Sequence, residues 1–141
     1  MFKNGKSLIK KNPIHFIDVM ATLRDITGAA YPETFNNQKV KPMQGESFLP
    51  ILLGEEFKRQ KPLFFEFARG GAIRDGKWKL VSKSLSKKKV TTNAIEWELY
   101  NIDKDLTETE DLSQQFPEKV KQLSQAWQQW YISSYGITKS K

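Results

Sequence analysis

The sequence predicts an α+β fold, with a small antiparallel β-sheet of about four strands, a packed C-terminal helix, and one separate helix before the sheet. Three observations predict it. Apolar residues repeat at helical spacing near both ends, residues 62–100 alternate as strands do, and Gly or Pro separates the segments. With 141 residues and 38% hydrophobic content, the chain is long enough for a domain with a buried core.

The first predicted helix follows Pro13. Its apolar residues recur at spacings of three and four, and they are Phe16, Val19, Met20, Leu23 and Ile26. Such a stripe is typical of an amphipathic helix that buries one face, and Gly28 predicts its end. We therefore assign residues 1–30 to a basic N-terminal loop and this helix.

A connector over residues 31–61 is predicted next. Its first part is rich in Pro, Asn and Gly, which favours an extended chain with turns. Pro50 allows only a short helical turn, from Phe48 or Pro50 to Leu53, and Gly54 closes it.

The strands are predicted from Pro62 onward. Residues 63–68 are aromatic-rich, and Asp75-Gly76 favours a two-residue type I′ hairpin turn. That turn would pair Ile73 with Trp78 and Arg74 with Lys77. The predicted core face carries Ile73, Trp78 and Leu80, and the predicted outer face carries Arg74, Lys77, Lys79 and Val81.

Residues 82–94 are rich in Ser, Lys and Thr, and we expect a solvated loop. The next strand places Trp97 and Leu99 inward. It also places Glu96 and Glu98 outward, where they are expected to oppose Lys77 or Lys79.

The last helix is predicted to begin at Pro117 and to end by Gly136. Its apolar stripe consists of Val120, Leu123, Trp127, Trp130 and Tyr131. Because large aromatic residues dominate core burial, we interpret this stripe as the face packed on the sheet. Residues 62–136 then form one α+β subdomain, and residues 137–141 form a tail.

Positive charge is concentrated in residues 61–90, which hold nine basic and two acidic side chains, whereas the whole chain has a net charge of +7. This distribution favours an anionic partner. It does not favour nucleic acid, because the predicted hairpin puts Trp78 on the face opposite Lys79, and a stacking platform needs aromatic rings and cations on one face.

Several chemistries are excluded by the residues. There is no Cys and one His, so thiolate and His-rich metal sites are excluded, and we interpret His15 beside Asp18 as a surface or packing residue. Asp103, Asp105 and Thr107 suit a calcium loop, but the required Gly and final Glu are missing. No apolar run approaches the ~20 residues that a membrane-spanning helix needs, so no membrane partner is expected. Leu8-Ile9 is too short for a signal peptide core of about 7–15 residues, so none is expected in this chain.

Four stretches, in order, resemble the C-terminal end of type I sulfatases of the arylsulfatase family, in the alkaline-phosphatase-like superfamily. They are HFIDVMATLRDITGAAYP, QGESFLPILLGE, LFFEFARGGAIRDGKWKLV and EWELYNIDKDLTETEDLSQQFPEKVKQLSQAWQQW. The resemblance covers residues 13–131. It implies that the first helix is the last large element of an α/β sulfatase domain and that residues 62–136 form its C-terminal subdomain.

The resemblance also implies a sulfuric ester hydrolase that uses formylglycine and calcium. The formylglycine motif, Cys or Ser followed by x-Pro-Ser-Arg, does not occur in this chain, and no metal pair of Asp and Asn maps onto it. We therefore expect no catalytic residue, no metal ligand and no cofactor here, and no hydrolysis by this chain alone. Phe67 departs from the His that many relatives carry after the Phe-Glu of this strand.

The expected role is that of a C-terminal sulfatase fragment beside the substrate cleft, with the upstream α/β domain as its partner and a sulfated carbohydrate or aryl sulfate as substrate. Arg69, in the loop between two strands, is the expected substrate-binding residue. The alternative is a stand-alone basic α+β module that binds sulfated glycan or nucleic acid. The resemblance implies a periplasmic or secreted location for the complete enzyme.

Overall fold

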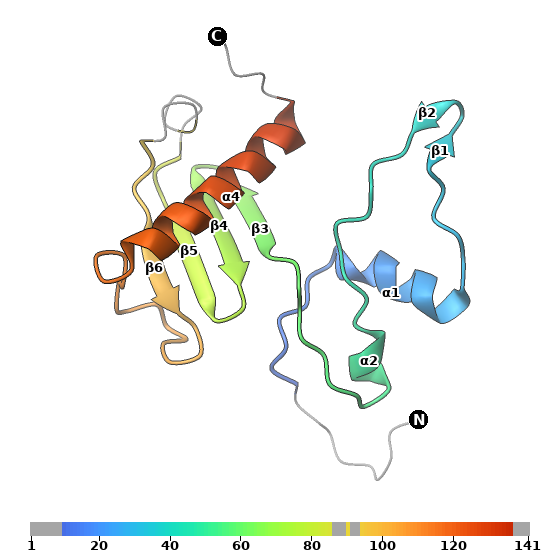
Figure 1. The fold of residues 1–141 in the computed structure, drawn as a ribbon, viewed down its shortest axis with the longest axis horizontal. Coiled ribbons are helices and arrows are strands. Elements are labelled where there is room, and N and C mark those ends of the chain that lie inside the picture. Colours follow the sequence, from blue (N-terminus) through green and yellow to red (C-terminus); the bar gives the residue numbers. More distant parts are fainter. Residues whose placement is uncertain (1–9, 86–89, 91–93, 137–141) are drawn as a thin grey trace. The chain divides into compact units, whose positions relative to one another are not determined.

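The computed structural model describes residues 10–85, 90 and 94–136. It divides into two compact units, Met1–Lys61 and Pro62–Lys141, called here the N-terminal unit and the C-terminal unit. The predicted α+β class is confirmed (Figure 1). The expected basic loop before Lys10 and the expected tail over 137–141 lie outside the described residues.

The C-terminal unit is a four-stranded antiparallel sheet with strands in sequence order. Its strands are β3 (Leu63–Phe67), β4 (Gly70–Asp75), β5 (Trp78–Ser82) and β6 (Glu98–Asn101). The long helix α4, Pro117–Tyr135, lies across one face of this sheet (Figure 1). The predicted four strands and packed C-terminal helix are therefore both present.

Helix α4 has the predicted ends and the predicted buried stripe. Pro117 occupies its first turn, and Gly136 ends it with a φ of 62° that a residue with a Cβ rarely adopts. Leu123, Trp127 and Tyr131 are buried, while Val120 and Trp130 are half-buried against the same core. The stripe is thus the packing face, as its spacing indicates.

Trp127 is the centre of the C-terminal core. Its side chain is fully buried, and its indole Nε1 donates a hydrogen bond to the carbonyl of Phe65 at 3.0 Å. A Cβ on Gly71 would lie 2.7 Å from the Trp127 ring, so only glycine lets strand β4 approach the indole this closely. Ile73, Leu80 and Leu99 pack in the same core.

The predicted hairpin register is wrong, because the turn lies one residue later in the sequence than predicted. The turn residues are Gly76 and Lys77, so Asp75 pairs with Trp78 and Arg74 pairs with Lys79. Gly76 alone has a positive φ, 56°, at this turn. A shift of the turn by one residue moves each cross-strand partner by two, so the core face of Ile73, Trp78 and Leu80 is unchanged. Lys77 lies in the turn instead of on the outer face.

The expectation of a solvated loop over residues 82–94 is wrong in its described part. Ser82 belongs to β5, and Leu85 and Val90 are 8% and 1% exposed as members of the core. Single apolar residues among Ser and Lys carry no periodicity, so the sequence pattern does not reveal them. Residues 86–89 and 91–93 lie outside the described part.

The expected pairing of Glu96 and Glu98 with hairpin lysines is also wrong. Lys79 forms an ion pair with Glu108, and Glu98 accepts a hydrogen bond from the Tyr100 hydroxyl at 2.9 Å. The turn after β6 folds back and supplies Glu108, because Asp105 accepts hydrogen bonds from the backbone N–H groups of Thr109 and Glu110. This return is a tertiary feature that strand alternation does not predict.

The N-terminal unit contains helix α1 (Asp18–Thr27) and the short helix α2 (Leu49–Leu52). Gly28 and Gly54 follow them with φ values of 68° and 81°, which confirms both predicted ends. A small hairpin of β1 (Thr34–Phe35) and β2 (Gln38–Lys39) lies in the predicted connector.

The β1–β2 hairpin is not among the predicted elements, although the sequence carries a signal for it. Asn36 and Asn37, between its strands, have φ values of 51° and 62°. Asn tolerates this left-handed region better than other non-glycine residues, and two such positions make a tight hairpin turn.

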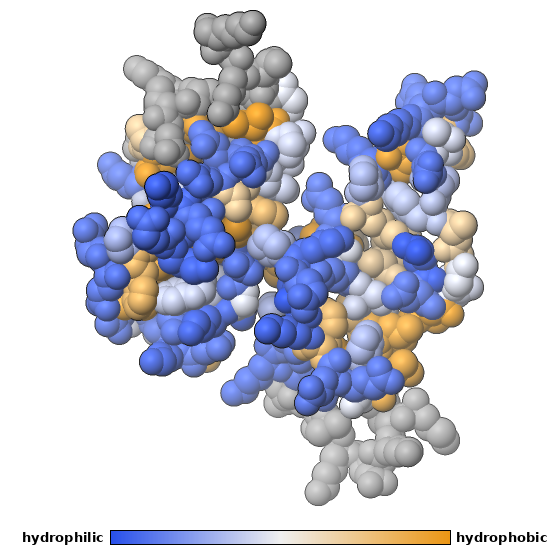
Figure 2. Space-filling model, in the orientation of Figure 1, coloured by the Kyte–Doolittle hydropathy of each residue, from blue (hydrophilic) through white to orange (hydrophobic). Residues whose placement is uncertain are grey.

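The predicted apolar stripe is open to solvent, and its first residue, Phe16, lies two residues before α1. The exposed fractions are 86% for Phe16, 38% for Val19, 57% for Met20, 50% for Leu23 and 54% for Ile26. The buried residues of the helix are instead Asp18, Ala21 and Thr22. Figure 2 shows apolar surface over the region of α1 and α2. Among the residues that the structure describes, the expected burial of the stripe is therefore not met.

Candidate functional site

The turn between β3 and β4 holds the predicted site residue Arg69. Phe67 pairs with Gly70, so Ala68 and Arg69 form a two-residue turn. The Arg69 carbonyl accepts a hydrogen bond from the N–H of Leu85 at 2.8 Å, which anchors the turn to the chain that follows β5. Its side chain is exposed and forms no hydrogen bond or ion pair with any other residue that the structure describes.

Ala68 gives this turn a strained backbone. Its φ is 52°, in the left-handed region where a Cβ is disfavoured. Backbone strain of this kind persists where surrounding contacts fix the conformation, and it is concentrated at functional sites.

Phe67 lies beside Arg69 and is the most exposed aromatic residue of the C-terminal unit. Its exposed fraction is 86%, against 37% for Phe65. Phe64 faces the helix-covered side of β3, where it is stacked on Trp130 with ring centroids 5.2 Å apart. By strand alternation, residues 63, 65 and 67 face the opposite side. In the sequence, Phe67 stands out only as a departure from the family pattern. Its position on the outer face of β3 follows from alternation, but its exposure does not.

The other cations of the hairpin have partners nearby. Lys79 is paired with Glu108, and Lys77 Nζ lies 5.4 Å from the ring centroid of Trp78. Arg74 Nε donates to the Gly76 carbonyl at 3.5 Å. The structure therefore does not gather these cations with Arg69 into one cluster.

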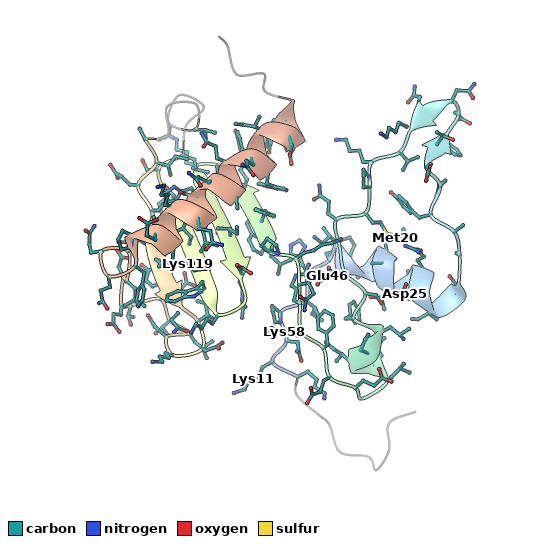
Figure 3. The ribbon with its side chains drawn as sticks, in the orientation of Figure 1. Lys11, Met20, Asp25, Glu46, Lys58 and Lys119 are labelled. Atoms are coloured by element: carbon teal, nitrogen blue, oxygen red, sulfur yellow. The ribbon has the colours of Figure 1, made fainter. Side chains whose placement is uncertain are left out.

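Asp18 is buried and forms an ion pair with Arg59. The two guanidinium nitrogens lie 2.6 and 3.0 Å from the two carboxylate oxygens, and the same oxygens accept backbone hydrogen bonds from His15 and Glu46. Glu46 lies beside the first turn of α1 (Figure 3). Burial alone would raise the pKa of Asp18, but the bonds from Arg59 and the two N–H groups outweigh it and lower the pKa.

The chain after α1 is held to the start of that helix by this ion pair. A Cβ on Gly45 would lie 2.1 Å from the Ile17 carbonyl oxygen, so glycine is required at this close approach. Phe48 N–H donates to the Thr22 hydroxyl at 3.0 Å. Asp18, bonded to the backbone N–H of His15, thus organises the packing of the N-terminal unit. The surface or packing role expected of the His15 side chain stays a prediction.

The acidic segment after β6 is a structural turn. Asp111 accepts from the N–H of Leu99 at 3.0 Å, and no group of three or more His, Asp or Glu in the described residues is placed to hold a metal. Burial, the hydrogen bond to Glu98 and nearby carboxylates raise the pKa of Tyr100 to about 12. Tyr100 therefore stays protonated near neutral pH. The calcium implied by the family resemblance does not fit the described residues of this chain.

An open hollow of about 720 Å³ lies next to the β1–β2 hairpin in the N-terminal unit. Arg24, Glu33 and Lys39 line it together with apolar residues such as Tyr31 and Met43. It lacks a nucleophile with an adjacent base, so its lining does not form a catalytic set. In the described part of the chain, no helix has both the length and the apolarity needed to cross a membrane.

The chain is similar in fold to part of several solved sulfatase structures. Ps i-CgsB, solved alone and in complex with k-i-k-neocarrahexaose, is 20% identical with a TM-score of 0.61. A sulfatase of Bacteroides thetaiotaomicron, from a core genetic locus for the metabolism of multiple glycosaminoglycans, is 20% identical with a TM-score of 0.53. No family model matches the chain.

These matches cover most of this chain but a minor part of the other proteins. They span 84% and 77% of this chain, and 24% and 23% of the two solved chains. The chain therefore spans about a quarter of the length of the sulfatases that it resembles. At this identity the likeness shows a shared fold.

Proposed function

We propose that this chain is the C-terminal portion of an arylsulfatase-type sulfuric ester hydrolase. In this proposal α1 is the last large element of the α/β sulfatase domain, and residues 62–136 form the subdomain beside the substrate cleft. The chain contributes to substrate binding and does not hydrolyse sulfate esters alone. The observation that carries the proposal is the exposed apolar stripe on α1.

The stripe supports a missing neighbour for two reasons. Met20, Leu23 and Ile26 are each at least half exposed on a helix whose opposite face is fixed by the Asp18–Arg59 ion pair. Burying a large apolar side chain stabilises a protein by about 1.5–3 kcal/mol, so a whole stripe left open is typical of an interaction surface. The fold likeness to a quarter of each solved sulfatase supports the proposal that this neighbour is a preceding α/β domain.

The preceding domain would supply the chemistry. The resemblance assigns formylglycine and the calcium ligands to segments that precede the four matching stretches. This chain's own contribution is Arg69, whose exposed guanidinium forms charge-assisted hydrogen bonds with a sulfate oxygen of the substrate.

The genomic reading frame tests the proposal directly. We expect the DNA upstream of the Met1 codon to encode, in the same frame, a Cys or Ser followed by x-Pro-Ser-Arg. An upstream frame that encodes an unrelated protein or stops without this motif would refute the proposal.

Arg69 is tested in the protein encoded by that complete frame. Because a charge-assisted hydrogen bond contributes about 1.5–3 kcal/mol, Arg69→Ala is expected to raise KM for a sulfated substrate at low salt by about tenfold or more, with kcat little changed. Lys83→Ala, an exposed cation of the same unit, is the matched control. An unchanged KM in the Arg69 variant would rule out the assigned role.

A stand-alone basic module is the second candidate, and the charge of residues 61–90 favours it. Such a module would bind heparin-like polymers or nucleic acid with an affinity that falls steeply with salt. Tight, strongly salt-dependent binding of the 141-residue chain to long polyanions, together with an unrelated upstream frame, would favour the module over the sulfatase portion.

A further inference from the structure

We infer that Phe67 and Arg69 form a subsite for one sulfated sugar residue, in which the phenyl ring stacks on the apolar face of the sugar and the guanidinium binds its sulfate ester. The inference rests on the proposed function and deepens it by choosing a sulfated carbohydrate over an aryl sulfate. It depends on Phe67, the last residue of β3, and on Arg69 in the β3–β4 turn.

The exposure of Phe67 indicates a binding role. Phe64 on the other face of β3 is stacked on Trp130, whereas Phe67 has no aromatic partner among the described residues and is 86% exposed. Its cross-strand partner is Gly70, which has no side chain. The space beside the ring on this face is therefore not occupied by the neighbouring strand, and a flat ligand can approach the ring.

The backbone that carries the two side chains is anchored. Ala68 has a φ of 52°, the Arg69 carbonyl is bonded to Leu85, and Gly71 is packed against Trp127. These contacts anchor the backbone on both sides of the turn. A site fixed before the ligand arrives loses less conformational entropy on binding.

The charge of Arg69 complements a sulfate ester. The ester is an anion at every physiological pH, and Arg is always protonated. Lys79 is neutralised by Glu108, but no carboxylate in the described residues pairs with Arg69. One ring at the end of β3 and one cation in the turn that follows match one sulfated sugar residue, whereas a nucleic acid strand needs a series of rings and cations.

The experiment measures binding of the 141-residue chain to k-i-k-neocarrahexaose and to its chemically desulfated form by calorimetry at several salt concentrations. The variants are Phe67→Ala, Phe67→Trp and Arg69→Ala. Phe35→Ala is the matched aromatic control, because Phe35 is 68% exposed and also precedes a two-residue turn. Lys58→Ala is the matched charge control.

Phe67→Ala is expected to weaken binding about five- to tenfold without changing its salt dependence, because it removes an uncharged contact. Arg69→Ala is expected to weaken binding about tenfold or more and to lower the slope of log Kd against log salt by up to about one. Phe67→Trp is expected to bind at least as tightly as the unchanged chain, and both controls to stay within twofold.

Three results with the hexasaccharide would overturn the inference. They are no binding by the unchanged chain, equal binding of the desulfated sugar, and a Phe67→Ala variant within twofold of the unchanged chain. Tighter binding of a short oligonucleotide with the same Phe67 dependence would also overturn it, in favour of nucleic acid. The upstream reading frame decides the proposed function separately, so failure of the subsite is distinguishable from failure of the sulfatase assignment.

Discussion

The two units of the chain are stabilised by opposite means. The C-terminal unit encloses Trp127, Leu80 and Leu99 between a sheet and a helix. The N-terminal unit instead buries the Asp18–Arg59 ion pair and leaves the apolar stripe of α1 in solvent. The N-terminal unit thus buries charge and exposes apolar residues, which is the reverse of a complete hydrophobic core. This contrast is the physical basis for proposing a missing domain.

The buried ion pair explains how the N-terminal unit keeps its shape without a large core. A buried pair contributes little net stability compared with apolar residues of the same size, but it is costly to break. The ion pair therefore holds Arg59 and Glu46 against the start of α1. It does not bury the apolar stripe of α1, which stays available to a partner.

The largest effect is expected from Arg59→Met. Removing the guanidinium leaves the Asp18 carboxylate buried without its charge partner, which costs about 3–5 kcal/mol. Hydrogen exchange of residues 18–27 should rise strongly. All four Trp residues lie after residue 62, so Trp fluorescence should report an intact C-terminal unit. Lys58→Met, at an exposed neighbour, is the control. Unchanged exchange in the Arg59 variant would contradict the role of the ion pair.

Gly71→Ala should destabilise the C-terminal unit instead. The added Cβ would overlap the Trp127 ring at 2.7 Å, and overpacking of this kind costs about 1–3 kcal/mol. Gly70→Ala is the matched control, because its Cβ would lie 3.4 Å from the nearest atom, the Phe67 carbonyl oxygen. Denaturant unfolding followed by Trp fluorescence measures both. Equal midpoints would show that β4 can move away from Trp127.

Acid should unfold the N-terminal unit through Asp18. Because the pKa of this carboxyl is lower in the folded chain than its ordinary value of 3.8, its contribution is complete above that value and is lost as pH falls through the folded pKa. Exchange of residues 18–27 should be constant from pH 7 to about 5, after correction for intrinsic rates, and rise below about pH 4. Asp25→Asn, on the exposed side of α1, should leave this transition in place. Stability that increases on acidification would contradict the sign.

The smallest effect on stability is expected from the double variant Met20→Ser, Leu23→Ser. Both side chains are at least half exposed, so the free energy of unfolding should change by less than about 0.5 kcal/mol per site. Self-association, measured by light scattering, should decrease because apolar surface is removed. A loss of several kcal/mol would show that the stripe is buried within this chain in solution.

Local patterns predicted the elements but not their pairing. Pro117, Gly136 and the Trp127 stripe determine α4 through local rules, and the aromatic run from Leu63 determines β3 in the same way. The partners of Lys79 and Asp18 come from residues 29 and 41 positions away, and no local rule reaches that far. Leu85 and Val90 were missed because single apolar residues have no period.

The candidate site was predicted only in part. Arg69 was singled out as a cation between two strands, and the structure confirms that position without testing its role. The candidate role of Phe67 could not be predicted from the sequence, because it depends on the exposure of the side chain. Alternation predicts which face of a strand a residue lies on, but not whether that face is covered.

The outer edge of strand β6 is hydrogen-bonded to the chain that follows it, and this affects how the isolated chain can aggregate. The N–H of Leu99 is bonded to the Asp111 carboxylate, and its carbonyl accepts from the N–H of Leu112. On the opposite edge strand the Phe65 carbonyl is bonded to Trp127. Edge groups that are already paired cannot template a further strand. Association of the purified chain should therefore begin at the apolar stripe of α1 and not at the β6 edge of the sheet.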